Sequence, residues 1–458
     1  MIGTLDTARR EVTIIGAGVS GMLAAYALDK KGYRVTLVEE KAKAGGLIQT
    51  RRTAYGMAET AAHSLLATPE VFALCEELGV ELAEVRRDSR ARFIVRGGRL
   101  RKFPLSAGEA VRTFARAAFA RGENHPDEQD LETWGRRHLG EAAVDNLLAP
   151  FVCGIYGVRP SELGVAAAFP ELAVEPGRTL LGTLLGKALG RDKKSRGKKN
   201  GGEENGGGEG NDKGRAGGRG AAAVTPEKKQ RKRMVAPLRG MGDLTSRLEA
   251  ELERRLGERF RRGVPADQIP DAPNVIVTVP AYAAARLFAD AEPELARSLE
   301  AVRYTPVVSA TAFVEQGALR RPVKGVGALA AAREGRQSLG VLFTSSAFEG
   351  RVADEGRLAS FAVLLGGTSR PGWAAASDAE IRLAVASELR DLAGLKDAPL
   401  EVVISRWPRA IPQYSTGLPA VWQKARETWC SRPGRVLFGN YTGQVSLRGM
   451  IEEAARLG

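Results

Sequence analysis

The 458-residue sequence predicts an α/β fold, α+β overall, in which a Rossmann-like domain is joined to a mixed-sheet domain and a helical domain. Three observations predict this organisation. Residues 11–39 read as strand, glycine turn, helix and strand, residues 106–190 are rich in Ala and Leu with a helical pattern, and mixed strands and helices run from residue 241 to 458. The length favours two or three domains.

The first β-α-β unit carries the strongest local motif, IIGAGVSG, in which Gly16, Gly18 and Gly21 form G-x-G-x-x-G between a strand and a helix. Gly16 permits the tight turn, Gly18 lets the backbone approach a pyrophosphate, and Gly21 lets the helix pack closely on the strand. The second strand ends at Glu39, 18 residues beyond Gly21, where a carboxylate can accept a ribose hydroxyl. The complete unit therefore predicts a dinucleotide site rather than a generic glycine turn.

Two further segments indicate FAD as the cofactor rather than NAD. Lys43, Gly45 and Gly46, in EKAKAGGLIQT, match the extension found in flavoproteins of the amine-oxidase type. Near the C-terminus, FGNYTGQVS places a glycine-rich turn between a short strand and a final helix, which suits a second contact with the cofactor. We expect that contact to use Gly439, Asn440, Val445 and Ser446.

The remaining segments define the expected domain boundaries. The sequence predicts a helix over residues 69–82, a hairpin around Gly97-Gly98, a helix over 241–257 and a buried strand at 275–279. The expected organisation is a first part of the FAD-binding domain at residues 11–90, a helical and substrate-side domain at 91–190, an insert at 191–233, a return to the FAD-binding domain at 234–281, a substrate domain at 282–405 and a C-terminal part of the FAD-binding domain at 406–458.

The positive charge of the chain is concentrated in one segment. The net charge is +14, and residues 191–233 carry 14 Lys and Arg against 6 Asp and Glu, together with 11 Gly. Such a composition predicts a disordered basic insert. A nucleic-acid-binding arm is the alternative interpretation, but the segment lacks the aromatic side chains of a base-stacking surface, so nucleic acid is not the expected partner.

Several classes of protein are disfavoured by composition. The three cysteines lie far apart and the three histidines have no ligand spacing, so neither a disulfide framework nor a metal site is expected. No apolar run is long enough to span a membrane, and only about ten residues precede the first strand, which leaves no room for a signal peptide. The expected location is therefore the cytoplasm.

Several stretches together resemble the protoporphyrinogen oxidases, FAD enzymes that act late in haem biosynthesis. LLAPFVCGIYGVRPSELGVAAAFPEL at residues 147–172 is similar to the signature of their helical domain, and RFIVRGGRLRKFP at 92–104 is similar to the hairpin that precedes it. RAIPQY at 409–414 and GNYTGQVSLRGMI at 439–451 resemble their C-terminal pair of motifs. The resemblance covers nearly the whole chain except residues 191–233.

The resemblance implies an FAD domain, a substrate domain and a helical domain associated with the membrane surface. It also implies removal of six electrons from protoporphyrinogen IX, a tetrapyrrole, with dioxygen reduced to hydrogen peroxide. A flavin supplies the difficult chemistry, which fits the lack of a catalytic triad or carboxylate pair in the sequence. Peripheral contact with the inner face of the cell membrane and a homodimer are both left open.

Four substrate-binding residues follow from the resemblance. Arg92 occupies the position of an arginine that faces a propionate of the tetrapyrrole, and a guanidinium suits a carboxylate. Phe93 is expected to line the pocket beside it. Leu329 in GVGALA and Leu364 in FAVLLGG match positions that enclose the macrocycle.

The sequence departs from the family pattern at two places. In AETAAHS, Glu59 is retained, but Ala61 and Ala62 stand where the family usually has Gly and Pro near the isoalloxazine ring. The segment at 261–281 is shorter than usual, and Val264 is the candidate for the adenine contact made there. Oxidation of coproporphyrinogen III, which has four propionates, therefore stays open as an alternative, as does a more distant FAD-dependent amine or carotenoid oxidoreductase.

Overall fold

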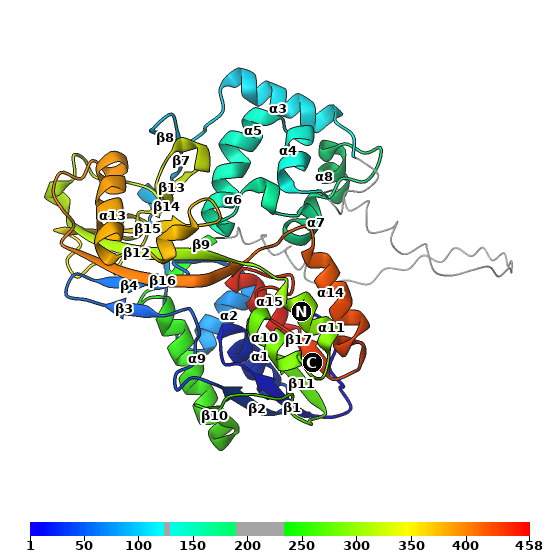
Figure 1. The fold of residues 1–458 in the computed structure, drawn as a ribbon. Helices are drawn as coiled ribbons and strands as arrows, with labels where there is room; N and C mark the ends of the chain where they lie inside the picture. Colours follow the sequence, from blue (N-terminus) through cyan, green and yellow to red (C-terminus); the bar gives the residue numbers. More distant parts are fainter. Residues whose placement is uncertain (123–128, 189–232) are drawn as a thin grey trace, which may run out of the picture.

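The computed structural model describes residues 1–122, 129–188 and 233–458, and Figure 1 shows them as three regions. A parallel sheet with helices on both sides forms the lower region, a larger mixed sheet lies above it, and a group of helices forms the top. The predicted basic insert at 191–233 lies, except for Arg233, outside the described residues.

The lower region is a five-stranded parallel sheet in the order β10-β2-β1-β11-β17. Its strands are β10 (Phe260–Arg262), β2 (Arg34–Glu39), β1 (Glu11–Ile15), β11 (Asn274–Val277) and β17 (Arg435–Leu437). Alternate residues of a strand point to opposite faces, and Ile14 and Ile15 accordingly enter two different cores. The parallel α/β fold expected for the cofactor-binding region is confirmed.

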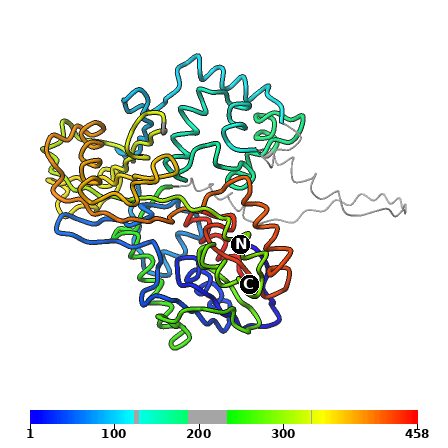
Figure 2. The backbone as a smooth tube through the Cα atoms, viewed as in Figure 1, coloured from blue at the N-terminus to red at the C-terminus, as the bar shows by residue number. Residues whose placement is uncertain are grey.

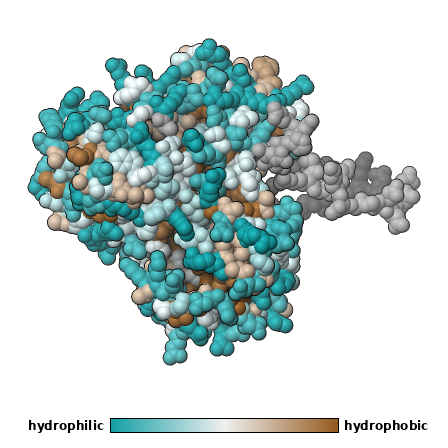
Figure 3. Space-filling view, in the orientation of Figure 1, coloured by the Kyte–Doolittle hydropathy of each residue, from teal (hydrophilic) through white to brown (hydrophobic). Residues whose placement is uncertain are grey.

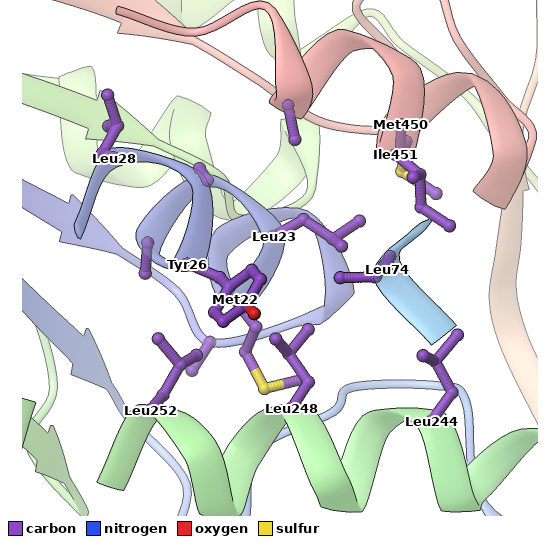
Figure 4. Packing of buried hydrophobic residues seen from close by; sticks show 14 of the residues in the cluster. Met22, Leu23, Tyr26, Leu28, Leu74, Leu244, Leu248, Leu252, Met450 and Ile451 are labelled. Carbon is purple, nitrogen blue, oxygen red and sulfur yellow. The ribbon is translucent and has the colours of Figure 1, made fainter. Parts of the chain in front are cut away.

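Helices cover both faces of this sheet. One face carries α1 (Val19–Lys30), α2 (Pro69–Glu77), α9 (Met241–Leu256) and α15 (Leu447–Ala455), and Figure 4 shows their apolar side chains meeting around Met22 and Leu23. The other face carries α10 (Ala281–Phe288), α11 (Pro293–Glu300) and α14 (Leu418–Glu427). The two ends of the chain lie close together (Figure 2), because the amino group of Met1 pairs at 2.6 Å with Glu453 of α15.

The predicted helix over residues 69–82 is too long. Helix α2 stops at Glu77, and Gly79 then adopts φ +64°, a conformation that favours glycine and ends the helix. The chain continues into strand β6 (Leu82–Glu84), which pairs with β9 (Arg233–Pro237). Strand β5 (Leu65–Ala67) completes this three-stranded sheet, and β3 (Thr50–Arg52) and β4 (Met57–Glu59) form a separate hairpin.

The larger sheet has seven strands in the order β16-β12-β15-β14-β13-β7-β8. These are β16 (Glu401–Pro412), β12 (Tyr304–Glu315), β15 (Leu358–Gly366), β14 (Ser338–Leu342), β13 (Gly327–Ala330), β7 (Arg92–Arg96) and β8 (Arg99–Arg101). The β13–β7 pair is parallel and the other pairs are antiparallel. Helix α13 (Asp378–Ala393) packs its apolar side chains on one face of the sheet, and the short helix α12 (Thr344–Ala347) follows β14.

One expected boundary differs from this topology. Strands β7 and β8 form the hairpin expected around Gly97-Gly98 and join the substrate sheet, within the range 91–190 expected to be a helical and substrate-side domain. The boundary expected between residues 405 and 406 lies inside β16, because this strand pairs with β12 from Glu401 to Pro412, with one register shift between Thr305 and Val307. The long antiparallel pairing with β12 keeps this whole strand in the substrate sheet.

The upper region contains six α-helices in the residues that the structure describes. They are α3 (Ala107–Phe119), α4 (Leu131–His138), α5 (Glu141–Ala143), α6 (Ala149–Tyr156), α7 (Val165–Ala168) and α8 (Leu180–Ala188), with a π-helical segment at Val144–Leu148. Hydrophilic residues, coloured teal, predominate on the face of the molecule seen in Figure 3. Within the described ranges, no helix has both the length and the apolar character needed to cross a membrane.

Candidate active site

The glycine turn after β1 has the geometry that the motif predicts. Gly16 adopts φ +97°, which a side chain would strain. A Cβ on Gly21 would lie 1.9 Å from the carbonyl oxygen of Gly16, so the helix packs against the turn too closely for any side chain. Gly18 differs, because a Cβ there would meet no atom within 4 Å. The space beside Gly18 is therefore available to a ligand at the N-terminus of α1.

Glu39 lies at the end of β2, directly beside this turn. Its Oε2 accepts a hydrogen bond from the Ala17 amide at 2.6 Å, and its Oε1 accepts one from the Lys41 amide at 3.0 Å. Val264 is 41% exposed and its amide donates to the Glu39 carbonyl at 3.0 Å, so the proposed adenine contact lies at the same end of the site. The two predicted contacts are thus neighbours, although 225 residues separate them in sequence.

The segment that carries Lys43, Gly45 and Gly46 crosses the glycine turn. The Gly45 amide donates to the Ala17 carbonyl at 2.9 Å, and a Cβ on Gly46 would lie 3.4 Å from the Cα of Gly18. Lys43 itself is exposed. The glycine pair therefore approaches the cofactor turn, as its composition predicts.

The C-terminal turn reaches the same place from the opposite end of the chain. Thr278 donates to the Gly16 carbonyl at 2.8 Å, and a Cβ on Gly439 would lie 3.8 Å from the Thr278 carbonyl oxygen. The Asn440 carbonyl accepts from Tyr414 at 2.6 Å, and Ser446 caps α15 by accepting from the Gly449 amide at 3.1 Å.

Val445, the last predicted member of this turn, is half-buried against the core on the α10 side of the sheet. The C-terminal turn thus lies close to the glycine turn.

These residues fit an elongated dinucleotide such as FAD. The open space at Gly18 suits a pyrophosphate, Glu39 and Val264 lie at one end, and the turn at 439–446 offers backbone groups beside it. Glu39 would hold the ribose, and the N-terminus of α1 would hold the pyrophosphate.

The loop after β4 corresponds to the departure Ala61-Ala62. Among the described residues, only glycines have positive φ, so Ala61 occupies its place without the conformational freedom of a glycine. The Thr60 carbonyl accepts from the Trp407 indole at 2.6 Å, and the Thr60 amide donates to the Gln49 carbonyl at 3.0 Å. Ala61 and Ala62 are both half-buried. The backbone conformation of the loop therefore accommodates both alanines.

A buried ion pair that the sequence did not predict lies directly before this loop. Glu59 and Arg351 are 3.3 Å apart, with side chains only 4% and 3% exposed. Glu59 also accepts from the Met241 amide at 2.9 Å and from the Thr50 hydroxyl at 2.7 Å. Burial raises the pKa of Glu59 and lowers the pKa of Arg351, although their mutual attraction opposes both shifts.

The face of the substrate sheet opposite α13 carries the two predicted leucines. Leu364 pairs with Gly340, Gly340 pairs with Leu329, and Leu329 pairs with Ile94, so these four residues form one row across four strands. Residues in register on adjacent strands point to the same face. We call Leu364, Gly340, Leu329 and Ile94 the apolar row.

Helix α6 lies over this row. A Cβ on Gly154 would meet the Leu329 side chain at 2.4 Å, which shows how closely the helix approaches β13. Leu329 and Leu364 are nevertheless only half-buried. The predicted leucines thus share one partly open face, with the helical region above it.

Arg92 and Phe93 point to opposite faces of β7. Arg92 is two residues from Ile94 and therefore faces the side of the apolar row, where it is exposed. Phe93 instead packs against the core under α13, where its ring centroid lies 6.4 Å from that of Phe343. Phe93 therefore lies on the face opposite the apolar row, because successive side chains of a strand alternate between faces, and its place in the substrate pocket stays a prediction.

His63 is the second functional candidate that sequence reasoning missed. It lines a small pocket together with Glu59, Arg351, and Thr311 and Leu342 of the substrate sheet. Sequence alone showed only that the histidines lack ligand spacing. The described residues also contain no group of His, Cys, Asp and Glu that could hold a metal ion.

Known proteins with similar sequences include plant enzymes. The chain is 25% identical over 476 residues to Protoporphyrinogen oxidase 2, chloroplastic/mitochondrial, of Arabidopsis thaliana, covering 96% of this chain and 91% of that protein. It is 26% identical to Coproporphyrinogen III oxidase of Bacillus subtilis, over 36% of this chain and 41% of that protein.

Solved structures share the fold. A putative protoporphyrinogen oxidase from Exiguobacterium sp. 255-15 has a TM-score of 0.70 at 19% identity, covering 97% of each chain. A UDP-galactopyranose mutase has a TM-score of 0.67 at 16% identity, covering 97% of this chain and 92% of the other. The sequence model for flavin containing amine oxidoreductases matches residues 19–458, so the chain belongs to that family and uses FAD.

Proposed function

We propose that this protein oxidises protoporphyrinogen IX to protoporphyrin IX. The substrate loses six electrons and six protons in three two-electron steps, and three dioxygen molecules are reduced to three hydrogen peroxide molecules. FAD supplies the chemistry by accepting a hydride in each step. The distant similarity to plant protoporphyrinogen oxidases over nearly the whole chain supports this substrate class.

The observation that carries the proposal is the partly open apolar row with an arginine on the same face. A tetrapyrrole is a broad apolar disc with carboxylates on one edge, so it needs a flat apolar surface and a cation beside it. Leu329 and Leu364 would contact the macrocycle, and the guanidinium of Arg92 would bind a propionate. Helix α6, packed on Leu329, would keep water away from one side.

Coproporphyrinogen III is the alternative substrate. It carries four propionates rather than two, so it would place more negative charge around the same surface. The similarity to the Bacillus subtilis coproporphyrinogen III oxidase covers only 36% of this chain, whereas similarity to the plant protoporphyrinogen oxidases covers 96% or more. We therefore favour protoporphyrinogen IX.

The test is anaerobic mixing of the FAD-loaded protein with each porphyrinogen in separate experiments, followed by loss of flavin absorbance. We expect bleaching with protoporphyrinogen IX at the higher rate, and recovery of absorbance with appearance of porphyrin fluorescence when air is admitted. Faster bleaching with coproporphyrinogen III would reassign the substrate. A flavin that neither compound bleaches would contradict the porphyrinogen oxidase function.

We also propose peripheral contact of the helical region with anionic lipid. Helix α3 has no buried residue, and Val111, Phe114 and Phe119 are 69%, 65% and 80% exposed. Arg112 is exposed on the same helix, and a helix with apolar and cationic side chains of this kind suits a membrane interface.

Sedimentation with phosphatidylglycerol–phosphatidylcholine vesicles tests the lipid contact. We expect Phe114→Ser to weaken binding, whereas Phe72→Ser on α2, also at an exposed phenylalanine, should leave it unchanged. Equal binding by both variants and the unchanged protein would contradict the role of α3.

A further inference from the structure

We propose that His63 accepts the proton that leaves the porphyrinogen in each two-electron step. This inference rests on the proposed function and adds a residue to it. In each step a bridging C–H bond breaks, its hydride goes to the flavin, and a proton goes to Nδ1 of His63. In two of the steps the proton leaves a pyrrole N–H and a C=N bond forms. In the remaining step it leaves a second bridging C–H and a C=C bond forms, because the porphyrin keeps two N–H groups and one hydrogen on each bridging carbon. The substrate thereby loses two electrons and two protons in each step.

His63 lies next to the substrate sheet, in the loop that the family resemblance places near the flavin. It lies in the loop after β4, and its Nε2 is 3.3 Å from the hydroxyl oxygen of Ser309. Ser309 pairs in register with Leu364, so it adjoins the end of the apolar row. An imidazole held by Ser309 is therefore close to the surface on which the macrocycle would lie.

The hydrogen bonds around Ser309 indicate which imidazole nitrogen is the base. The Ser309 hydroxyl donates to the Glu59 carbonyl oxygen at 3.4 Å, so it is left to accept from Nε2–H of His63. This tautomer leaves the lone pair on Nδ1. Nδ1 is buried and lacks a hydrogen-bond partner in the part of the chain that the structure describes.

Burial and one neighbouring positive charge keep the imidazole neutral. Burial, together with the nearby Arg351 cation, lowers the pKa of His63 to about 4. Glu59 and Arg351 are the other titratable side chains that line its pocket. A neutral imidazole is the form that can accept a proton at neutral pH.

Glu59 is less suited to the same task. Its carboxylate already accepts hydrogen bonds from Met241 and Thr50 and pairs with Arg351. Once His63 is protonated, the positive charge of Arg351 favours release of the proton. Release to water restores the neutral base for the next step.

The experiment measures flavin bleaching by protoporphyrinogen IX, under anaerobic conditions, from pH 5.5 to 9. General-base catalysis contributes about 10²–10⁴-fold, so His63→Gln should lower the bleaching rate about 100-fold. The unchanged protein should show a flat profile in this range, whereas the variant should become faster as pH rises, because hydroxide replaces the base. Added imidazole should partly restore bleaching in His63→Ala.

Controls separate a chemical role from a structural one. Flavin content and thermal midpoint verify that each variant is folded, and Arg99→Ala on the exposed hairpin strand β8 should bleach at the normal rate. Ser309→Ala keeps the imidazole but removes its hydrogen-bond partner, so it should slow bleaching less than His63→Gln. A folded His63→Gln variant with the normal rate and a flat profile would overturn the inference.

A second measurement does not depend on activity. The chain has only three histidines, so ¹⁵N-labelled histidine gives three pairs of ring-nitrogen signals, and His63→Gln identifies the pair from His63. We expect a neutral Nε2–H imidazole at pH 6.5, and a cationic one would overturn the inference. If the unchanged protein is not bleached at all, the proposed function fails and this inference fails with it.

Discussion

The cofactor turn and the substrate sheet build their binding surfaces in opposite ways. At the turn, cofactor binding would depend on the absence of side chains at Gly18 and Gly21 and on backbone groups within a short segment. On the sheet, substrate binding would depend on side chains from separate strands, such as Leu364 and Leu329, that register brings into one row. The first surface is therefore rigid and local, whereas the second depends on long-range pairing.

Substitutions in the glycine turn should have the largest effect. Gly21→Ala places a Cβ 1.9 Å from the Gly16 carbonyl oxygen, so the helix or the turn must move, and we expect loss of bound FAD together with lower stability. Gly18→Ala meets no protein atom within 4 Å, so the apoprotein should fold normally and bind FAD poorly.

Flavin absorbance after purification and thermal melts of the apoprotein distinguish the two glycines. We expect Gly21→Ala to lack bound flavin and to melt at a lower temperature. We expect Gly18→Ala to lack bound flavin but to melt at the normal temperature. Normal FAD content in Gly18→Ala would contradict the proposed position of the pyrophosphate.

The buried ion pair joins the two regions, and breaking it should have the next largest effect. Removing one partner of a buried pair typically costs about 3–5 kcal/mol, because the other charge stays buried. Arg351→Met should therefore destabilise the protein strongly, and Glu59→Gln in the same chain should recover much of the loss. Urea unfolding of the single and double variants at constant FAD concentration measures this coupling; additive effects would contradict it.

The difference between the two regions also explains what the sequence could predict. The cofactor turn was predictable because Gly16, Gly18 and Gly21 encode their geometry within six residues. The partnership of Glu59 with Arg351 was not, because 292 residues separate them and only the fold brings them together.

The face on which Phe93 lies was not predictable for a different reason. Phe93 follows Arg92 directly, and the two-residue period of a strand sends neighbouring side chains to opposite faces. Resemblance identified the strand, but the register of β7 with β13 decides which of its side chains faces the apolar row.

The pH dependence of stability gives a smaller effect. His63 has a pKa of about 4 in the folded protein, against 6.5 when unperturbed. Between these values the unfolded chain binds a proton that the folded protein does not, so stability falls as pH decreases. From pH 7 to pH 5 this single group should cost roughly 2 kcal/mol.

Comparison with His63→Gln isolates this contribution. The variant lacks the imidazole, so its free energy of unfolding should decrease less between pH 7 and pH 5. Urea titrations at both pH values measure the difference. Parallel losses in the two proteins would mean that His63 is protonated to the same extent in the folded and unfolded states.

Arg92 should show the smallest effect, because it is exposed and, in the proposed function, would contact only the edge of the substrate. Arg92→Ala removes a charged hydrogen bond that would position the propionate without contacting the reacting carbon, so we expect KM to rise about tenfold with little change in kcat. The KM of Arg92→Lys should lie between the KM of the unchanged protein and that of Arg92→Ala, since an ammonium retains the charge but loses the planar fork of the guanidinium.

Arg99→Ala, on the neighbouring strand β8, is the matched control and should leave KM unchanged. Steady-state porphyrin fluorescence gives both constants. A kcat that falls while KM stays constant would place Arg92 at the chemistry rather than at the edge of the apolar row, and equal effects of the Arg92 and Arg99 substitutions would attribute binding to general surface charge.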